Sequence, residues 1–289
     1  MLGYIVWDVE PEVFRLGFLA PRWYGLLFAA AFLLGYYFVR WMFRKEDQPE
    51  AWLDNLLLYM IAGTVIGARL GHVLFYDPAY YLSNPLEIPM IWKGGLASHG
   101  GGLGMTVALY LFARKVKKKP LIWFTDRLCL PTAIGAAMVR LGNLFNHEIV
   151  GRPTDSSLGF VFTHCHLDRY LQPLTHDPAL MEAYQLYGGH VPRFPTQLLE
   201  ALCYLLTGIA IFVVYQRANY RPKPGLMIGV FLFMTFVARF FIEFLKENQV
   251  AFEDGLPLNM GQILSIPFVF IGLYLIFRKN PSLSPNHNS

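Results

Sequence analysis

The sequence predicts an all-α polytopic membrane protein, with about seven transmembrane helices and a small extracytoplasmic head. Composition is the first indication. Of the 289 residues, 55% are hydrophobic and only 15% are charged, whereas soluble domains contain roughly 25% charged residues. Distribution is the second indication, because the hydrophobic residues gather into runs of about 18 to 22 residues, the length that crosses a bilayer as a helix. A large soluble protein is therefore disfavoured.

Seven runs along the chain have this length. They comprise residues 22–43, 53–75, 96–114, 123–146, 195–216, 225–246 and 258–278. The second and sixth runs are the least uniform, because they contain Arg69 and Arg239. We expect each run to form one membrane-spanning helix.

Two connections between the runs are long enough to matter. The segment 147–194 is too polar and too rich in proline and glycine to span a membrane, so we expect it to form the head. The shorter loop 76–95 contains Trp92 and several tyrosines, which suit a membrane interface. The expected division of the chain is 1–146 (N-terminal segment and four helices), 147–194 (head), 195–280 (three helices) and 281–289 (disordered tail).

Basic residues predict the orientation, because Lys and Arg are enriched in cytoplasmic loops. They follow the first, third, fifth and seventh runs: Arg40, Arg44, Lys45; Arg114, Lys115, Lys117, Lys118, Lys119; Arg217, Arg221, Lys223; Arg278, Lys279. The alternate connections are poorer in basic residues and richer in acidic ones. We therefore expect the N-terminus outside, the C-terminus in the cytoplasm and the head on the outer side.

The remaining composition argues against two classes of function. The net charge of +4 could suggest a nucleic-acid partner, but the basic residues cluster between the apolar runs, so no nucleic acid is expected. None of the three cysteines forms a C-x-x-C pair. The tract His164-Cys165-His166 has poor spacing for metal ligands, and we interpret it as a polar strand of the head. No metal site is expected.

Polar side chains within the runs lie at one depth. At a rise of about 1.5 Å per residue, Arg140 is roughly 25 Å along its helix, toward the outer surface. The same estimate places several other polar residues in this layer: Tyr24, Arg69, His99, Asn143, Arg239, Glu243, Asn259 and Gln262. Snorkelling to the interface would explain one or two arginines, but not the histidine, amides and glutamate. Since polar groups in hydrocarbon are costly unless partnered, we infer a shared polar site.

Helical spacing groups some of these residues. Arg140 and Asn143 are three residues apart and share a face with His147. Arg239 and Glu243 are four residues apart, and a purely structural ion pair is the alternative explanation for them. Several arginines at this depth suit a phosphate or carboxylate, and phosphates are found in lipid head groups.

His99 is the candidate general base of this layer. The alternative is a structural histidine at the start of a tightly packed helix, since three glycines follow it. The polar layer thus indicates a membrane enzyme or binder that acts on an anionic lipid from the outer side.

One motif in this polar layer matches the signature of a known protein family. The stretch Arg140-Leu141-Gly142-Asn143-x2-Asn146-x-Glu148-x2-Gly151-Arg152 resembles the signature of bacterial prolipoprotein diacylglyceryl transferases. Further matches occur in order along almost the whole chain: Arg22-Trp23-Tyr24-Gly25, Gly67-Ala68-Arg69, Ser98-His99-Gly100-Gly101, Arg193-x-Pro195-Thr196-Gln197-x2-Glu200, Arg239-x3-Glu243-Phe244 and Asn259-Met260-Gly261-Gln262-x2-Ser265-x-Pro267.

The resemblance implies a reaction and a place. The sn-1,2-diacylglyceryl group of phosphatidylglycerol moves to the lipobox cysteine thiol in the signal peptide of a preprolipoprotein. A thioether forms and glycerol 1-phosphate leaves, which is the first step of lipoprotein maturation. The family has seven membrane helices, a periplasmic head and no metal or dissociable cofactor. It is multi-pass in the bacterial cytoplasmic (inner) membrane, with the active site toward the periplasm.

The resemblance also implies site residues. Those expected to be catalytic are Tyr24, His99, Arg140, Arg239 and Glu243, and those expected to bind phosphatidylglycerol are Arg69, Arg140, Asn143, Asn146, Gly151 and Arg239. The arginines Arg140 and Arg239 would hold the phosphate, His99 would help to deprotonate the thiol, and Glu243 would position Arg239 or the head-group glycerol.

The chain departs from the family pattern at a few positions. Thr235 and Leu199 stand where tyrosines are common, Lys246 stands where arginine is frequent, and the segment 153–191 matches poorly. A transporter or flippase for an anionic lipid is the alternative function. Such a protein would usually show inverted repeats and polar groups near the midplane, and this sequence shows neither.

Overall fold

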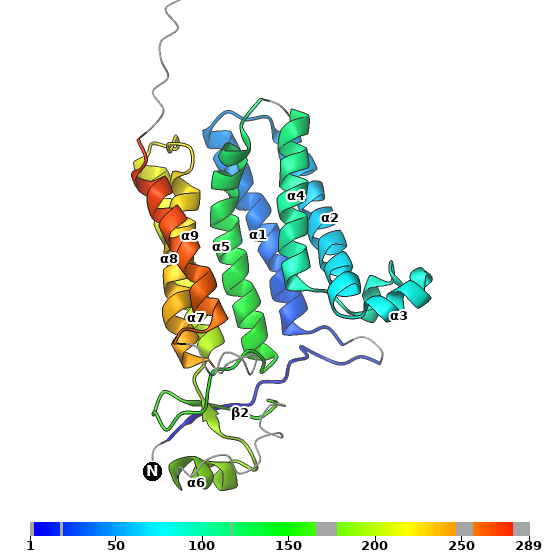
Figure 1. The fold of residues 1–289 in the computed structure, drawn as a ribbon, viewed down its shortest axis with the longest axis vertical. Coiled ribbons are helices and arrows are strands. Elements are labelled where there is room, and N and C mark those ends of the chain that lie inside the picture. Colours follow the sequence, from blue (N-terminus) through cyan, green and yellow to red (C-terminus); the bar gives the residue numbers. More distant parts are fainter. Residues whose placement is uncertain (1–2, 18–19, 117, 166–177, 247–256, 280–289) are drawn as a thin grey trace, which may run out of the picture. The chain divides into compact units, whose positions relative to one another are not determined.

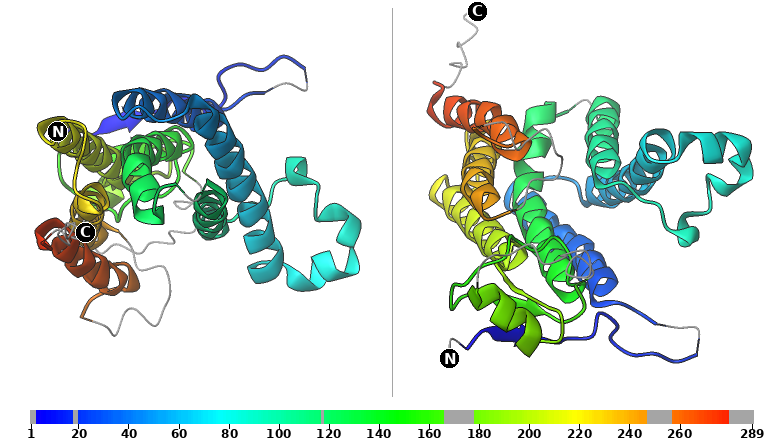
Figure 2. Two further views of the ribbon diagram at one scale, coloured as in Figure 1. Left: turned by 90° about the horizontal axis from the view of Figure 1, so that it is seen from above. Right: turned by 60° about the horizontal axis from the view of Figure 1, so that its bottom comes forward.

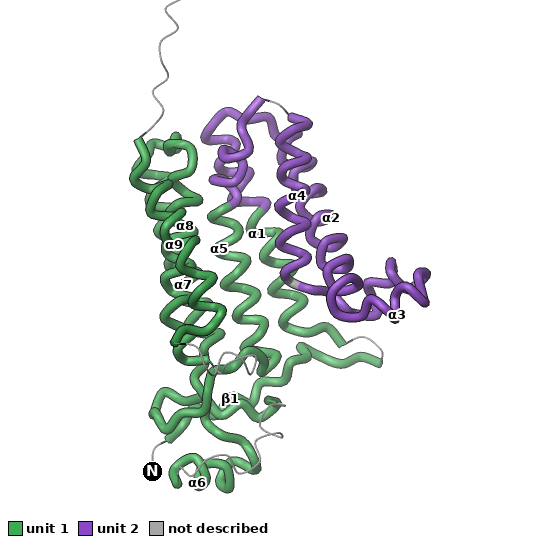
Figure 3. The backbone as a smooth tube through the Cα atoms, viewed as in Figure 1, with its two compact units in different colours: residues 1–35, 129–289 green, residues 36–128 purple. Residues whose placement is uncertain are grey.

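The computed structural model describes residues 3–17, 20–116, 118–165, 178–246 and 257–279, without the side chain of Ser98. His166 and the expected disordered tail 281–289 lie outside these residues. The chain forms two compact units (Figure 3): unit 1 contains residues 1–35 and 129–289, and unit 2 contains residues 36–128.

Every run expected to be helical forms a helix close to the expected bounds (Figure 1). These helices are α1 (Trp23–Lys45), α2 (Glu50–Phe75), α4 (Ser98–Val116), α5 (Leu121–Phe145), α7 (Thr196–Arg217), α8 (Leu226–Ile242) and α9 (Met260–Phe277). Short helices are α3 (Pro78–Ser83), α6 (Pro178–Leu186), η1 (Pro85–Glu87), η2 (Ile91–Lys93) and η4 (Glu243–Leu245).

Six helical segments in the described part of the chain are long and apolar enough to cross a membrane. They are α1, α2, α5, α7, the stretch Leu226–Leu245 and α9. Helix α4 has 19 residues and is less apolar, since it contains His99, several glycines and two basic residues in its last turn. The fold is thus mostly helical and consistent with a polytopic membrane protein.

In unit 2, helices α2 and α4 pack through glycines. A β-carbon at Gly67 would lie 2.4 Å from the carbonyl oxygen of Gly100, and one at Gly104 would lie 2.0 Å from that of Gly63. No larger residue fits at these distances, so the glycines allow the two backbones to touch. The series Gly63, Gly67 and Gly71 is therefore a packing face between the two helices.

In unit 1, three short strands differ from the all-helical expectation, and the tract interpreted as a polar strand is not one of them, because His164 lies in a turn and Cys165 follows it outside any strand. Strand β1 (Ile5–Trp7) pairs in parallel with β2 (Phe160–Phe162), which pairs antiparallel with β3 (Pro192–Arg193). The N-terminal segment and the segment 147–194 therefore fold together. Figures 1 and 2 show the N-terminal strand beside α6 at one end of the unit, and the rings of Tyr4 and Tyr187 are 6.3 Å apart there.

A small apolar core joins these strands to the end of α5. Leu144, Val150, Phe162 and Cys165 are buried together, with Trp7 packed against them. The Trp7 indole N–H donates to the carbonyl of Leu144 at 3.1 Å. The polar motif at the end of α5 therefore lies directly against this core.

Candidate functional site

The last turn of α5 carries a network of polar side chains. The Arg140 guanidinium donates to Asn143 Oδ1 at 3.1 Å, and Asn143 Nδ2 donates to Glu148 Oε1 at 2.8 Å. Asn146 Nδ2 donates to the same Glu148 oxygen at 3.1 Å. Asn143 is buried and Glu148 is exposed. The structure thus brings together Arg140, Asn143 and Asn146, as expected from the spacing of the first two and from the motif. His147, expected on the same helix face, lies beyond the end of α5, and its ring contacts Val9 and His164 instead.

A buried carboxylate from α7 joins this network to the end of α8. Glu200, 1% exposed, lies with Oε2 2.6 Å from Arg140 Nε and Oε1 2.8 Å from Lys246 Nζ. Lys246 Nζ also lies 3.7 Å from Glu243 Oε2. Two cations and two anions thus alternate in one chain of contacts. Because their charges cancel, the group is tolerable away from water.

Glu243 is also held from the start of α9. That helix begins with a capping box, in which Asn259 and Gln262 exchange side-chain-to-backbone hydrogen bonds. Gly261 lies within this first turn, and a β-carbon there would be 2.6 Å from the Glu243 carboxyl carbon. Gly261 therefore gives Glu243 the space that it occupies. No ion pair forms between Arg239 and Glu243 in the structure; Glu243 pairs with Lys246 instead.

Other polar groups in unit 1 have unused hydrogen-bonding capacity. The Arg239 guanidinium has no hydrogen bond or ion pair with any residue that the structure describes, although its charge acts on Tyr204. Both amide atoms of Gln197, which is fully buried one turn before Glu200, lack a partner, as does Asn146 Oδ1. Each unmet buried group costs about 1–3 kcal/mol, so these groups indicate a place for a polar ligand or water.

Tyr24 and Gly151 flank the network. A β-carbon at Gly142 would lie 2.7 Å from the Tyr24 ring, so this ring lies against α5 one residue before Asn143. A β-carbon at Gly151 would lie 2.7 Å from the carbonyl oxygens of both Phe194 and Leu245. The geometry therefore explains Gly151 by close backbone packing, whereas the sequence placed it among lipid-binding residues.

His99 and Arg69 belong to unit 2, so the structure does not place them relative to the Arg140 network. His99 is exposed near the start of α4. Arg69 is buried and donates four hydrogen bonds to the carbonyls of Glu87, Ile88, Gly94 and Gly95. Its guanidinium also lies over the Tyr81 ring at 4.8 Å. These contacts differ from the expected lipid-binding role, because they make Arg69 the anchor of the loop before His99.

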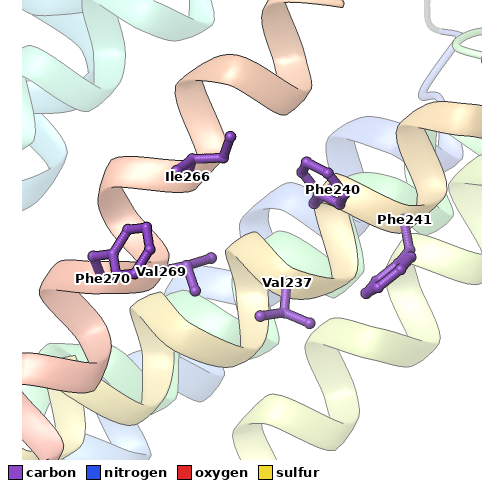
Figure 4. Close-up of a pocket in the computed structure, with 6 residues that line it drawn as sticks. All are labelled: Val237, Phe240, Phe241, Ile266, Val269 and Phe270. Atoms are coloured by element: carbon purple, nitrogen blue, oxygen red, sulfur yellow. The ribbon is translucent and has the colours of Figure 1, made fainter. Parts of the chain in front are cut away.

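An apolar groove lies apart from this network, between two helices of unit 1. It has a volume of about 280 Å³ between α8 and α9 and is lined by Val237, Phe240, Phe241, Ile266, Val269 and Phe270 (Figure 4). Arg239 is two positions from Val237 and from Phe241, so it faces another side of α8. The polar network is therefore a separate feature, and this groove contains no group that could do chemistry.

Sequence reasoning did not select Glu200, Lys246 and Gln197 as site residues. In the sequence, Lys246 stands out only as a replacement for arginine, and Gln197 and Glu200 only as parts of a matching motif. Their helix positions could have been a signal, since Gln197 and Glu200 are one turn apart in an apolar run. No group of three or more His, Cys, Asp or Glu side chains that could hold a metal occurs in the described ranges.

Comparison with known proteins identifies the family. The family model described as prolipoprotein diacylglyceryl transferase matches residues 11–278. A phosphatidylglycerol–prolipoprotein diacylglyceryl transferase of Chloroherpeton thalassium is 44% identical over 276 residues, covering 96% of this chain and 94% of that protein. Proteins of the same name from Porphyromonas gingivalis and Tolumonas auensis are 45% and 40% identical, over 96% and 94% of this chain and 96% of each protein. The chain therefore belongs to the prolipoprotein diacylglyceryl transferase family.

Proposed function

We propose that this protein transfers the sn-1,2-diacylglyceryl group of phosphatidylglycerol to the lipobox cysteine of preprolipoproteins. The thiolate sulfur attacks the terminal glyceryl carbon, the carbon–oxygen bond to the phosphate breaks, and glycerol 1-phosphate leaves with the electron pair. Family membership and the names of the relatives support this reaction, and they do not favour a transporter or flippase.

The observation that carries the proposal is the unequal pairing of the site arginines. Arg140 is fixed by Glu200 and Asn143, while Arg239 has no hydrogen bond or ion pair among the described residues. A phosphodiester supplies one negative charge and two free oxygens, and a guanidinium offers a planar fork that fits such an anion. Arg239 is therefore the first phosphate ligand, with Arg140 held in position as the second.

Charge develops on the departing phosphate oxygen as the bond to carbon breaks. Groups held in place before the reaction stabilise that charge without reorganising. Glu200 has this preparatory role, because it fixes Arg140 and Lys246 in a dry environment. Asn146 and Gln197, with unmet hydrogen-bonding groups, would receive the hydroxyls of the head-group glycerol, and Tyr24 would line the site beside Asn143.

The thiol must lose its proton before it attacks, since the thiolate is the nucleophile. We assign this proton to His99, which is exposed and has no partner among the described residues. Glu243, held by Lys246, orients the polar groups around the phosphate. Arg69 is assigned to the loop before His99, and Gly151 to packing, so neither is proposed as a direct lipid contact.

We further propose the topology and location. Helix α4 is the seventh span, with its polar first turn at the lipid-water boundary. The N-terminus and the head 147–194 lie in the periplasm and the C-terminus lies in the cytoplasm, following the basic residues after α1, α4, α7 and α9. The site then faces the periplasmic side of a bacterial inner membrane, where the lipobox cysteine is presented. No cofactor or metal is required.

Reconstitution tests this proposal. Purified protein in liposomes that contain phosphatidylglycerol is mixed with a lipobox peptide, and peptide mass and released glycerol phosphate are measured. We expect a diacylglyceryl thioether on the cysteine and equimolar glycerol 1-phosphate. A serine-containing peptide is the control. Lipid movement between leaflets without modified peptide would instead support a flippase and contradict the proposal.

A further inference from the structure

His147 lies inside the site motif in an unusual conformation. It is 3% exposed and has a φ of 53°, the left-handed region that non-glycine residues adopt at a cost of about 1–2 kcal/mol. Such a conformation persists where surrounding contacts determine it. Asn146 and Glu148, on either side, belong to the Arg140 network. The direction of both neighbouring side chains therefore depends on how His147 is held.

Both ring nitrogens of His147 are engaged with the backbone. Nε2 lies 2.9 Å from the carbonyl oxygen of Val9, to which it donates. Nδ1 accepts from the backbone N–H of His164 at 3.4 Å. A carbonyl can only accept and an N–H can only donate, so this pair of contacts requires a neutral imidazole protonated at Nε2. A proton on Nδ1 would remove the bond to His164.

Charged and titratable groups of the neighbouring segments surround His147. The His164 ring packs against it edge to face with centroids 4.8 Å apart. His164 Nε2 lies 3.6 Å from Asp8 Oδ1 and 3.8 Å from Glu10 Oε1. On its own segment, Glu148 follows it. His164 is the more exposed of the two histidines and faces these two carboxylates.

We propose that His147 is a positioning residue whose neutral ring ties Val9 and His164 to the site motif, so that acidification releases Asn146 and Glu148 and lowers diacylglyceryl transfer reversibly. This inference rests on the proposed function. The link to the site is direct, because the Glu148 N–H donates to the carbonyl of Asn143 at 3.1 Å and the two asparagines share Glu148 Oε1.

The direction of the pH effect follows from the surroundings. Burial lowers the pKa of His147 below its ordinary value, and the charge on His164 lowers it further, although the Val9 carbonyl, Asp8 and Glu10 oppose this. The neutral, tied state is complete above about pH 6.5 and is lost as the pH falls through the lowered pKa. While the pH is still well above that pKa, each unit by which the pH falls raises the protonated fraction about tenfold.

The test compares pH profiles of transfer. Because the proposed base also makes the rate of transfer depend on pH, the informative quantity is the slope of the acidic limb. His147→Asn keeps a residue that tolerates left-handed backbone but cannot take a proton. On the acidic limb, we expect the slope of the logarithm of the rate against pH to be smaller by one in this variant than in the wild type. The rate at pH 8 should fall no more than about tenfold. His164→Gln should move the wild-type limb to higher pH, because one repelling charge is gone.

A second readout separates this inference from the proposed function. Hydrogen exchange of the backbone amides of residues 143–151, corrected for intrinsic pH dependence, should speed up on acidification in the wild type but not in His147→Asn or His147→Gly. Equal slopes and equal exchange in wild type and His147→Asn would overturn the inference. Absence of transfer at every pH would contradict the proposed function, and the exchange data would still decide whether His147 is the acid-sensitive tie.

Discussion

Replacement of Glu200 tests most sharply whether the buried charge chain prepares the site. Glu200→Gln keeps the shape of the side chain but removes the charge that contacts Arg140 at 2.6 Å and Lys246 at 2.8 Å. Removing one member of a buried ion pair costs about 3–5 kcal/mol. In this variant Arg140 still has its hydrogen bond to Asn143 and is partly exposed, and Lys246 still has its ion pair with Glu243. We therefore expect the lower end of this range, about 3 kcal/mol, as the loss of transition-state stabilisation. This corresponds to a transfer rate roughly 100-fold lower.

The assay is single-turnover transfer to a lipobox peptide in detergent–lipid micelles, with the folded fraction measured by thermal melting. Glu46→Gln is the matched control, because Glu46 also forms a buried ion pair with an arginine, Arg127 in unit 2, at 2.6 Å. It should lower the melting temperature without changing the rate per folded molecule. The double variant Glu200→Gln/Lys246→Met should transfer about tenfold faster than Glu200→Gln alone, since the excess positive charge left by the first substitution is removed. A rate for Glu200→Gln within twofold of wild type would refute the preparatory role.

Three further predictions concern single side chains. Arg239→Lys keeps the charge but not the fork and should lower transfer about 10- to 100-fold, whereas Arg239→Gln should abolish it, as followed by glycerol phosphate release. Arg69→Met should destabilise the loop before His99 by about 3 kcal/mol, because four hydrogen bonds to backbone carbonyls are lost. In a titration of lipid, the KM for phosphatidylglycerol should stay within twofold of the wild-type value. A large rise in this KM would instead support a lipid-binding role for Arg69. Gly261→Ala should displace the Glu243 carboxylate and lower kcat more than it raises KM, and unchanged kcat would show that Glu243 has no part in the reaction.

Most of the helical fold could be predicted from the sequence, because membrane helices follow from local composition. Run length and apolar content are read along the chain, and each expected run became a helix. The three-stranded sheet could not be predicted in this way. Strand β1 pairs with β2, about 155 positions later, and a three-residue strand has no periodicity of its own. The N-terminal segment was therefore assigned to the membrane helices, whereas it folds with the head segment.

Depth and helical spacing predicted part of the site. They correctly brought Arg140 together with Asn143, and the motif added Asn146, since these residues lie within two turns of one helix. Depth alone could not separate a ligand-facing arginine from a structural one. Arg69 and Arg239 are expected at similar depths from their positions along their runs, yet Arg69 is satisfied by four carbonyls and Arg239 has no hydrogen bond or ion pair among the described residues.

The ion pairs between side chains of different helices could not be predicted from the sequence. Arg239 and Glu243, four residues apart, suggested an intrahelical ion pair. The structure instead pairs Glu243 with Lys246, and Lys246 also contacts Glu200 of α7. Such pairing depends on which faces of α7 and α8 meet, and this is set by packing along their whole lengths. The same holds for Gly261, whose importance depends on the position of Glu243.

We propose that Arg140 and Arg239 together bind the phosphate of the lipid that donates the diacylglyceryl group. The most direct measurement is a single-turnover reaction of purified wild-type protein, Arg140→Gln and Arg239→Gln, with phosphatidylglycerol labelled in its head group and a lipobox peptide. We expect the wild type to release labelled glycerol 1-phosphate in step with thioether formation, and both variants to lose transfer at least 100-fold while remaining folded. Near-normal transfer by either folded variant would show that the arginine replaced in it is not needed to bind the phosphate.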